Sequence, residues 1–145
     1  MAVEDIIEIQ ALAQTYADGV MQRDAEIWGS TWAEDGAWHL RPGMDPVKGR
    51  DNLKAFWSQI MSGYPRVLHF VQPGLVSVDG DRATARFYVQ EKIKDAEGNV
   101  IRVAGVYHDE LIRERGRWRF AVRRFNAMYR GPMDMSGDWP GFPAD

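Results

Sequence analysis

The sequence predicts an α+β fold: a curved, mostly antiparallel sheet wrapped around three N-terminal helices, forming a cone-shaped pocket. Up to about residue 63 the apolar residues recur every three or four positions, which is typical of one face of a helix. From residue 64 to residue 130 apolar and polar residues alternate, which is typical of strands. Aromatic residues make up 12% of the 145 residues. Such a content fits a large core in a curved sheet, an aromatic-lined cavity, or both.

The helical region divides into three segments. The first has an apolar stripe that we expect to face the concave side of the sheet: Ile9, Ala13, Tyr16 and Val20. Asp24 is placed to cap a short second helix that runs to about residue 33. Residues 34–36 should end that helix before a short strand at 37–40, and a third helix begins near Asp51 and ends at Gly63.

Four longer strands are expected in the second half of the chain, at residues 67–78, 82–94, 100–113 and 117–129. The first should bend near Pro73 and Gly74, and short turns between consecutive strands predict an antiparallel meander. The tail, 131–145, is expected to be irregular and to pack across a pocket mouth or a neighbouring subunit. Residues 1–145 together have the size of a single domain.

Composition excludes several classes of protein. The chain has no cysteine, so disulfides and thiolate metal sites are excluded. A net charge of −3 argues against nucleic acid as a partner. No apolar run reaches the roughly 18 residues of a membrane helix, and the acidic N-terminus does not resemble a secretory signal. We therefore expect a cytoplasmic protein without a membrane partner.

Histidine is the first side chain to consider for proton transfer near neutral pH. The chain has three histidines, His39, His69 and His108. His69 stands between apolar neighbours on a strand expected to be central, which fits either a catalytic or a buried structural histidine. His108 shares its face with Glu110, which places it on the outer face of the sheet. The side of the sheet that His39 faces stays open.

Two further charged residues are candidates for the concave side. Alternation places Asp109 on the buried face of its strand, either to support a histidine or to form an ion pair with an arginine of the adjacent strand. Arg123 and Arg124 lie on opposite faces of that adjacent strand, so one of them points toward the cavity. A cavity arginine can stabilise developing negative charge. Phosphate-loop, nucleophile and metalloprotease motifs are absent from the sequence, and the spread of histidines predicts no metal site.

Several phrases of the sequence, in this order, resemble the SnoaL-like branch of the cystatin-like, nuclear-transport-factor-like fold. They are WAEDGAW at 32–38, KGR at 48–50, LHF at 68–70, GVYHDE at 105–110 and GRWRF at 116–120. The resemblance covers nearly the whole chain. This branch includes scytalone dehydratase, ketosteroid isomerase relatives and a hexachlorocyclohexane dehydrochlorinase, so the fold alone does not fix the reaction.

The resemblance implies that His69 is a catalytic residue and that Arg123, five residues beyond Trp118, faces the pocket. It also implies chemistry that needs no cofactor. In relatives an aspartate of the first helix pairs with the histidine, but this chain has Met21 at that position. A carboxylate from elsewhere must then support His69, and Asp24 and Asp109 are the candidates.

The leading hypothesis is an enzyme, a lyase or isomerase, in which His69 transfers a proton on a small, largely apolar and possibly aromatic or polycyclic molecule. Arg123 would stabilise an oxyanion or a leaving group. The residues expected to line the substrate pocket are Tyr16, Val20, Met21, Trp38, Phe87, Val89, Gly105, Tyr107 and Phe125. The alternative hypothesis is a non-catalytic binding module or an accessory protein like a dioxygenase beta subunit, which the missing first-helix aspartate favours.

We also expect a homodimer or homotrimer. The outer face of the sheet is predicted to carry Val106, Ile112, Tyr88 and either Phe120 or Phe125. This is more apolar area than a solvated face normally exposes.

Overall fold

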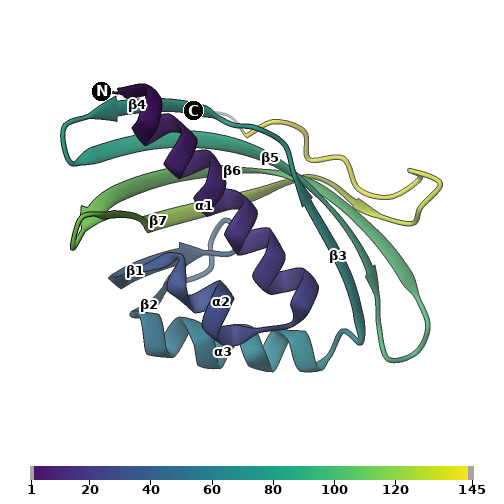
Figure 1. The fold of residues 1–145 in the computed structure, drawn as a ribbon. Helices are drawn as coiled ribbons and strands as arrows, with labels where there is room; N and C mark the ends of the chain where they lie inside the picture. Colours follow the sequence, from purple (N-terminus) through teal and green to yellow (C-terminus); the bar gives the residue numbers. More distant parts are fainter. Residues whose placement is uncertain (1, 144–145) are drawn as a thin grey trace.

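The computed structural model describes residues 2–143, and its architecture is the predicted α+β class (Figure 1). Three helices come first in the chain and a curved sheet follows. The helices are α1 (Ala2–Gln22), α2 (Ala25–Ser30) and α3 (Arg50–Ser62). The strands are β1 (Trp32–His39), β2 (Val47–Lys48), β3 (Arg66–Val71), β4 (Leu75–Asp79), β5 (Arg82–Lys94), β6 (Val100–Glu114) and β7 (Arg117–Gly131).

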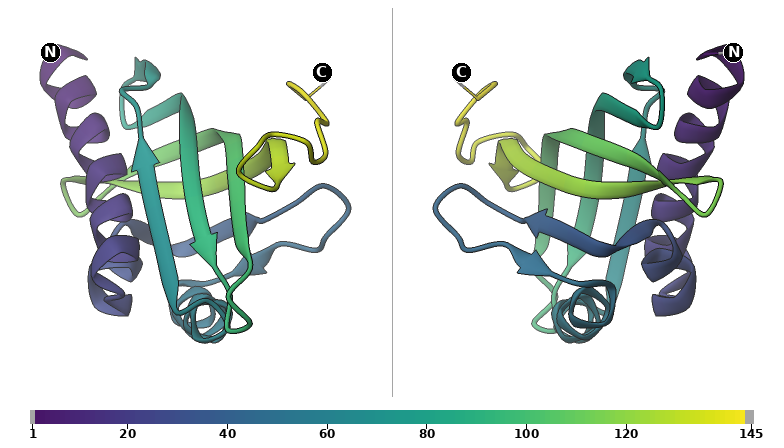
Figure 2. Two further views of the ribbon diagram at one scale, coloured as in Figure 1. Left: turned by 90° about the vertical axis from the view of Figure 1, so that its right-hand side faces the viewer. Right: turned by 90° about the vertical axis from the view of Figure 1, so that its left-hand side faces the viewer.

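The strands form one seven-stranded sheet in the order β2-β1-β7-β6-β5-β3, with β4 also paired to β5. Neighbours are antiparallel except β1 and β7, which are parallel. The views in Figure 2 show the sheet curling around the helices, with α1 alongside the edge formed by β3 and β4. This leaves β3 as an edge strand that faces a helix.

Aromatic side chains fill much of the concave side of the sheet. Trp28, Trp32 and Trp118 are fully buried, and Trp28 stacks on Trp57 with ring centroids 5.0 Å apart. The apolar stripe of α1 predicted from the sequence packs into this cluster. Helix α1 can approach α2 closely because Gly19 has no side chain: a Cβ there would lie 2.6 Å from the Trp28 backbone nitrogen.

Two element boundaries differ from the prediction. Helix α2 ends at Ser30, and β1 already begins at Trp32, so residues 34–36 lie within a strand. The pairing of β1 with β7 shifts register between Trp32 and Ala37, which accommodates the turn-forming residues as a bulge. The expected strand 67–78 is divided into β3 and β4, because Pro73 has no N–H to donate to a ladder.

The predicted outer face of the sheet needs a correction. Phe120 is fully buried in the concave core, and the ring of Phe125 packs 4.9 Å from that of Tyr107 on the same side. Pairing between β6 and β7 shifts register twice, between Glu110 and Leu111 and between Ala104 and Gly105. Each shift changes the residue parity, so simple alternation could not place both aromatic residues.

The described part of the C-terminal tail lies against β7 and the outer face of the sheet. Trp139 packs on Tyr129, and the ring of Phe142 lies 5.8 Å from that of His108. His108 is therefore on the outer face, as alternation predicted. Residues 144–145 lie outside the described residues, and none of residues 131–143 lines the groove between α1 and β3. Among residues 2–143, no helix is both long enough and apolar enough to cross a membrane.

Candidate functional site

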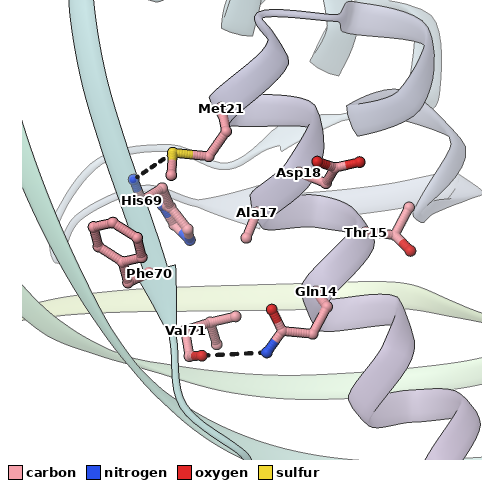
Figure 3. Close-up of a pocket in the computed structure, with 8 residues that line it drawn as sticks. All are labelled: Gln14, Thr15, Ala17, Asp18, Met21, His69, Phe70 and Val71. Atoms are coloured by element: carbon pink, nitrogen blue, oxygen red, sulfur yellow. Dashed lines mark hydrogen bonds between the residues drawn. The ribbon is translucent and has the colours of Figure 1, made fainter.

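A groove of about 450 Å³ lies between α1 and the edge strand β3. Figure 3 shows the histidine ring of β3 directed toward the helix, with apolar and amide side chains around it. The residues that line the groove are Gln14, Thr15, Ala17, Asp18, Met21, His69, Phe70 and Val71.

Side chains of α1 hydrogen-bond to backbone groups along this edge of the sheet. The Gln10 amide donates to the Gly74 carbonyl at 2.7 Å and accepts from the Gly74 N–H at 2.8 Å. Gln14 donates to the Val71 carbonyl at 3.3 Å, and Met21 Sδ accepts from the His69 N–H at 3.3 Å (Figure 3). Edge strands carry backbone groups without a neighbouring strand, so these contacts hold the helix beside β3 and keep the groove between them.

His69 is paired with a glutamate of the neighbouring strand. Its Nδ1 lies 3.1 Å from Glu91 Oε2, and the two residues are directly opposite in the β3–β5 pairing. The histidine is 4% exposed, whereas the Glu91 side chain is 23% exposed. With the Glu91 carboxylate as acceptor, Nδ1–H is the donor of this hydrogen bond and Nε2 is the ring nitrogen left outside it. This geometry favours the tautomer that has its lone pair on Nε2.

A second polar cluster lies deeper in the concave side. Asp109 accepts from Arg123 Nε at 2.8 Å and from Nη2 at 3.0 Å, and both side chains are almost completely buried. The Arg123 guanidinium also lies over three rings, 3.7 Å from the centroid of Tyr107, 3.9 Å from Phe120 and 4.4 Å from Tyr16. The two tyrosine hydroxyls are 3.2 Å apart.

Burial sets the charge states in this cluster. It raises the pKa of Tyr16 above its ordinary value and that of Tyr107 well above it, so both hydroxyls stay protonated near neutral pH. Burial opposes the charge of Arg123, but Asp109 and the two tyrosines raise its pKa. Arg123 is consequently a permanent cation in an aromatic enclosure, and two of its nitrogens are already bonded to Asp109.

The structure places His69 and Arg123 on the same side of the sheet. Tyr16 connects their surroundings, because its ring lies 5.7 Å from that of His69 and also stacks beneath the Arg123 guanidinium. Its hydroxyl meets that of Tyr107. The Glu91–His69 pair and the cluster of Tyr16, Tyr107 and Arg123 are therefore adjacent, joined by the ring contact between His69 and Tyr16.

The prediction that Asp109 or Asp24 hydrogen-bonds His69 is wrong. Asp109 is engaged by Arg123 in the ion pair that the sequence offered as the alternative. Asp24 caps α2, where its carboxylate accepts from the N–H groups of Glu26 and Ile27. Both hydrogen bonds of the cap use the Asp24 carboxylate. The hydrogen-bond partner of His69 is Glu91.

Most of the predicted pocket-lining residues are packed in the core. Met21 lines the groove, whereas the others lie among the aromatic side chains of the concave side: Tyr16, Val20, Trp38, Phe87, Val89, Gly105, Tyr107 and Phe125. A Cβ at Gly105 would overlap the Phe125 ring. The indole N–H of Trp38 is buried and, within the described residues, has no hydrogen-bond partner. The groove is therefore peripheral to the cone that the sequence predicted as the pocket.

Sequence reasoning missed Glu91, although a signal was present. Ala83, Ala85, Phe87 and Val89 form the buried face of β5, and the same alternation continues to position 91. A charged residue on an otherwise apolar face needs a partner, because burying an unpaired charge is costly. No described group of three or more His, Asp or Glu side chains is arranged to hold a metal ion.

Comparison with known proteins identifies the family. The SnoaL-like domain family model matches residues 1–124, so the chain belongs to the SnoaL-like family. Rv3472 of Mycobacterium tuberculosis, a protein of unknown function whose structure is that of a single-residue variant, is similar in sequence as well as in structure. It is 32% identical with a TM-score of 0.76, over 86% of this chain and 77% of its own. No curated protein matches the chain significantly.

Two structures with functional names share the fold at lower identity. The scytalone dehydratase-like protein of Novosphingobium aromaticivorans has a TM-score of 0.84 at 18% identity, covering 99% of this chain and 97% of its own. A type 2 hexachlorocyclohexane dehydrochlorinase, LinA, has a TM-score of 0.82 at 22% identity, with coverages of 96% and 95%. At these identities the likeness establishes a common fold and leaves the reaction open.

Proposed function

We propose that this SnoaL-like protein is an enzyme that removes a proton from carbon in a small, largely apolar molecule, acting as a lyase or isomerase without a cofactor. The observation that carries the proposal is the His69–Glu91 pair, whose histidine lines a groove. A tautomer-fixed imidazole beside a cavity has the arrangement of a general base. The names of the dehydratase-like and dehydrochlorinase neighbours are consistent with this class of chemistry.

In the proposed lyase reaction His69 Nε2 takes the proton, the electron pair of the broken C–H bond forms a carbon–carbon double bond, and a leaving group departs from the adjacent carbon with the electron pair of its own bond. In the proposed isomerase reaction the C–H electron pair instead displaces a neighbouring carbonyl π pair onto oxygen, and the imidazolium then returns the proton to another carbon as the oxyanion becomes a carbonyl again. Glu91 accepts from Nδ1–H throughout and stabilises the imidazolium that forms. General-base catalysis of this kind contributes about 10²–10⁴-fold to the rate.

The deeper cluster would supply the charge stabilisation. The Tyr16 and Tyr107 hydroxyls are protonated donors, and Arg123 Nη1 is the guanidinium nitrogen that is not bonded to Asp109. A buried cation and oriented hydroxyls stabilise an oxyanion more strongly than water does. Tyr16 contacts both His69 and Arg123, so a substrate that uses both groups must displace or pack against its ring.

The lining of the groove indicates the substrate class. Ala17, Met21, Phe70 and Val71 provide apolar contacts, and the lining contains no lysine or arginine. Asp18 would repel an anion. We therefore propose a neutral, mostly apolar substrate.

Exchange of a substrate C–H bond for C–D in D2O tests the proton-transfer step without knowledge of the final product. Neutral compounds with an activated C–H bond, including scytalone and hexachlorocyclohexane, are incubated with the protein in D2O and followed by NMR and mass spectrometry. We expect exchange or elimination with at least one compound. His69→Ala should lower that rate about 10²–10⁴-fold. Glu91→Gln should lower it about 10- to 100-fold, the kinetic equivalent of one charge-assisted hydrogen bond.

Glu97→Gln serves as the matched control, because Glu97 is an exposed acid in the β5–β6 loop. Its rate should equal that of the native protein. A His69→Ala rate equal to the native rate would remove His69 as the base.

Ligand binding without catalysis is the second candidate function. The position of Arg123 favours it, because this cation is buried, paired with Asp109 and not part of the groove lining, so the groove offers a binding surface without the charge-stabilising group. Saturable binding of a panel compound with no exchange and no product, in the native protein and in His69→Ala alike, would support this function over the enzyme.

A further inference from the structure

We propose that Met21 is an oxidation site, and that its conversion to the sulfoxide by a peroxide changes the conformation of His69. This inference goes beyond the proposed function and does not require His69 to be catalytic. It rests on one uncommon contact, in which a thioether sulfur accepts from the backbone of the histidine that lines the groove.

Met21 combines exposure with a structural role. The residue is 37% exposed and lies in the last turn of α1, where it lines the groove. Its Sδ is 3.3 Å from the His69 backbone nitrogen. The dashed line in Figure 3 marks this contact. The contact supplies an acceptor to an edge-strand N–H that faces α1. A thioether is a weak acceptor, so a stronger acceptor placed nearby can replace the sulfur in this hydrogen bond.

The chemistry needs only a hydroperoxide as the oxidant. A sulfur lone pair attacks the terminal peroxide oxygen and forms the S–O bond, while the O–O bond breaks. With hydrogen peroxide the oxygen that leaves takes up a proton and departs as water. The thioether is oxidised to a sulfoxide, and the peroxide is reduced.

We expect oxidation to change the local geometry, because a sulfoxide oxygen is a stronger acceptor than the thioether sulfur and competes for the His69 N–H. A hydrogen bond from N–H to an oxygen spans about 2.7–3.2 Å between the two heavy atoms. The present separation of sulfur and nitrogen is 3.3 Å, which leaves no room for an oxygen atom between them. For the oxygen to accept from this N–H, either the Met21 side chain turns or the backbone at His69 moves, and the second change alters how the imidazole meets Glu91.

Two other methionines provide internal controls. Met133 is 38% exposed, which matches Met21, but it lies in the tail after β7. Met61 is 7% exposed and packs in the core. Exposure predicts similar oxidation rates for Met21 and Met133 and a much slower rate for Met61. The effect on His69 should follow oxidation of Met21 alone.

The experiment treats the whole protein with dilute hydrogen peroxide and follows each methionine by peptide mass spectrometry. Amide and imidazole NMR signals report on His69 in the same samples. We expect the His69 amide signal to shift from its native position in step with Met21 oxidation, in the native protein and in Met133→Leu. In Met21→Leu the same treatment should leave the His69 signals where they are.

Slow oxidation of Met21, no faster than that of Met61, would overturn the proposal, and so would oxidation of Met21 without a shift at His69. Met21→Gln adds an arm without oxidant, because its amide carbonyl is a polar acceptor like the sulfoxide oxygen. Its His69 amide signal should already be displaced. The oxidation experiment follows signals of the protein itself and needs no substrate. A negative result here is therefore distinguishable from a negative result of the exchange assay that tests the proposed function.

Discussion

The Asp109–Arg123 ion pair is the interaction whose loss we expect to cost most in stability. Both side chains are at most 1% exposed, so removing one charge leaves the other buried and uncompensated. Asp109→Asn should lower the free energy of unfolding by about 3–5 kcal/mol. Urea unfolding followed by circular dichroism measures this change. The double variant Asp109→Asn with Arg123→Met should be more stable than the single variant, because it removes the stranded cation.

Glu110→Gln is a matched control one residue away. Glu110 pairs with Arg124 at the same 2.8 Å separation, but these side chains are 51% and 49% exposed. An exposed pair of this kind contributes about 0–1 kcal/mol. Equal losses for Asp109→Asn and Glu110→Gln would contradict the assignment of the buried pair as a structural element of the core.

The candidate site was partly predictable from single residues. Alternation placed His69 and Asp109 on the concave face, and the family resemblance selected Arg123 over Arg124. The sequence offered Asp24 and Asp109 as partners of His69, and the partner in the structure is Glu91, which continues the buried face of β5 opposite the histidine. Cross-strand register decides which side chains meet, and register depends on pairings far apart in the sequence.

The first turn of helix α1 is hydrogen-bonded to the β6–β7 hairpin. The Asp5 carboxylate accepts from Trp118 Nε1 at 3.0 Å and from Arg113 Nη2 at 2.8 Å. Both hydrogen bonds lower the pKa of Asp5 below its ordinary value of 3.8, and the bond from Trp118 has the larger effect. The resulting stabilisation is complete above pH 3.8 and is lost as the pH falls through the lower pKa of the folded state.

Asp5→Asn should therefore lower the melting temperature at neutral pH, and its difference from the native protein should shrink as the pH falls below 3.8. Thermal unfolding of both proteins between pH 7 and pH 3 measures this difference. Glu4→Gln, at an exposed position in the same turn, is the control. A difference between native protein and Asp5→Asn that stays constant across this range would show that the carboxylate charge has no part in the attachment.

Elements were predicted best where local signals are strong. Helix α3 ends before Gly63 as predicted, although Gly63 stays right-handed with φ −84° and the helix closes with hydrogen bonds to carbonyls three residues back. The turns between long strands follow from Gly and Asp residues. Strand β1 was misjudged because its pairing with β7 joins residues that are far apart in the chain, and this pairing outweighs the turn signal at 34–36. The break between β3 and β4 falls where Pro73 and Gly74 predict a bend, and Gln10 of α1 binds Gly74 there.

At the scale of the whole molecule, the packing of the cone was the least predictable property. The aromatic content fitted both a core and a cavity. In the structure many of the aromatic side chains are packed in the core, such as the stacked Trp28 and Trp57. The volume left inside a sheet depends on how side chains interdigitate, and a sequence alone does not specify that. The groove beside α1 instead follows from the docking of one helix on one strand.

We propose that the chain forms a homodimer or homotrimer through the outer face of the sheet. With Phe120 and Phe125 facing inward, the apolar side chains on this face are fewer than the sequence indicated. Tyr88 is 37% exposed there, and the tail adds Phe142 at 47% and Trp139 at 60%. Exposed aromatic groups that gather on one face are typical of an interaction site.

Light scattering coupled to size exclusion, at micromolar protein concentration, should give two or three times the mass of one chain. Tyr88→Glu and Phe142→Glu should each lower that mass, because each removes an aromatic ring from the apolar contact area and adds a charge to the interface. Ile7→Glu is the control, since Ile7 is 64% exposed but lies on α1, away from the outer face. A native chain that elutes as a monomer under these conditions would contradict the prediction. A mass unchanged by Tyr88→Glu and Phe142→Glu would move the interface to another face of the molecule.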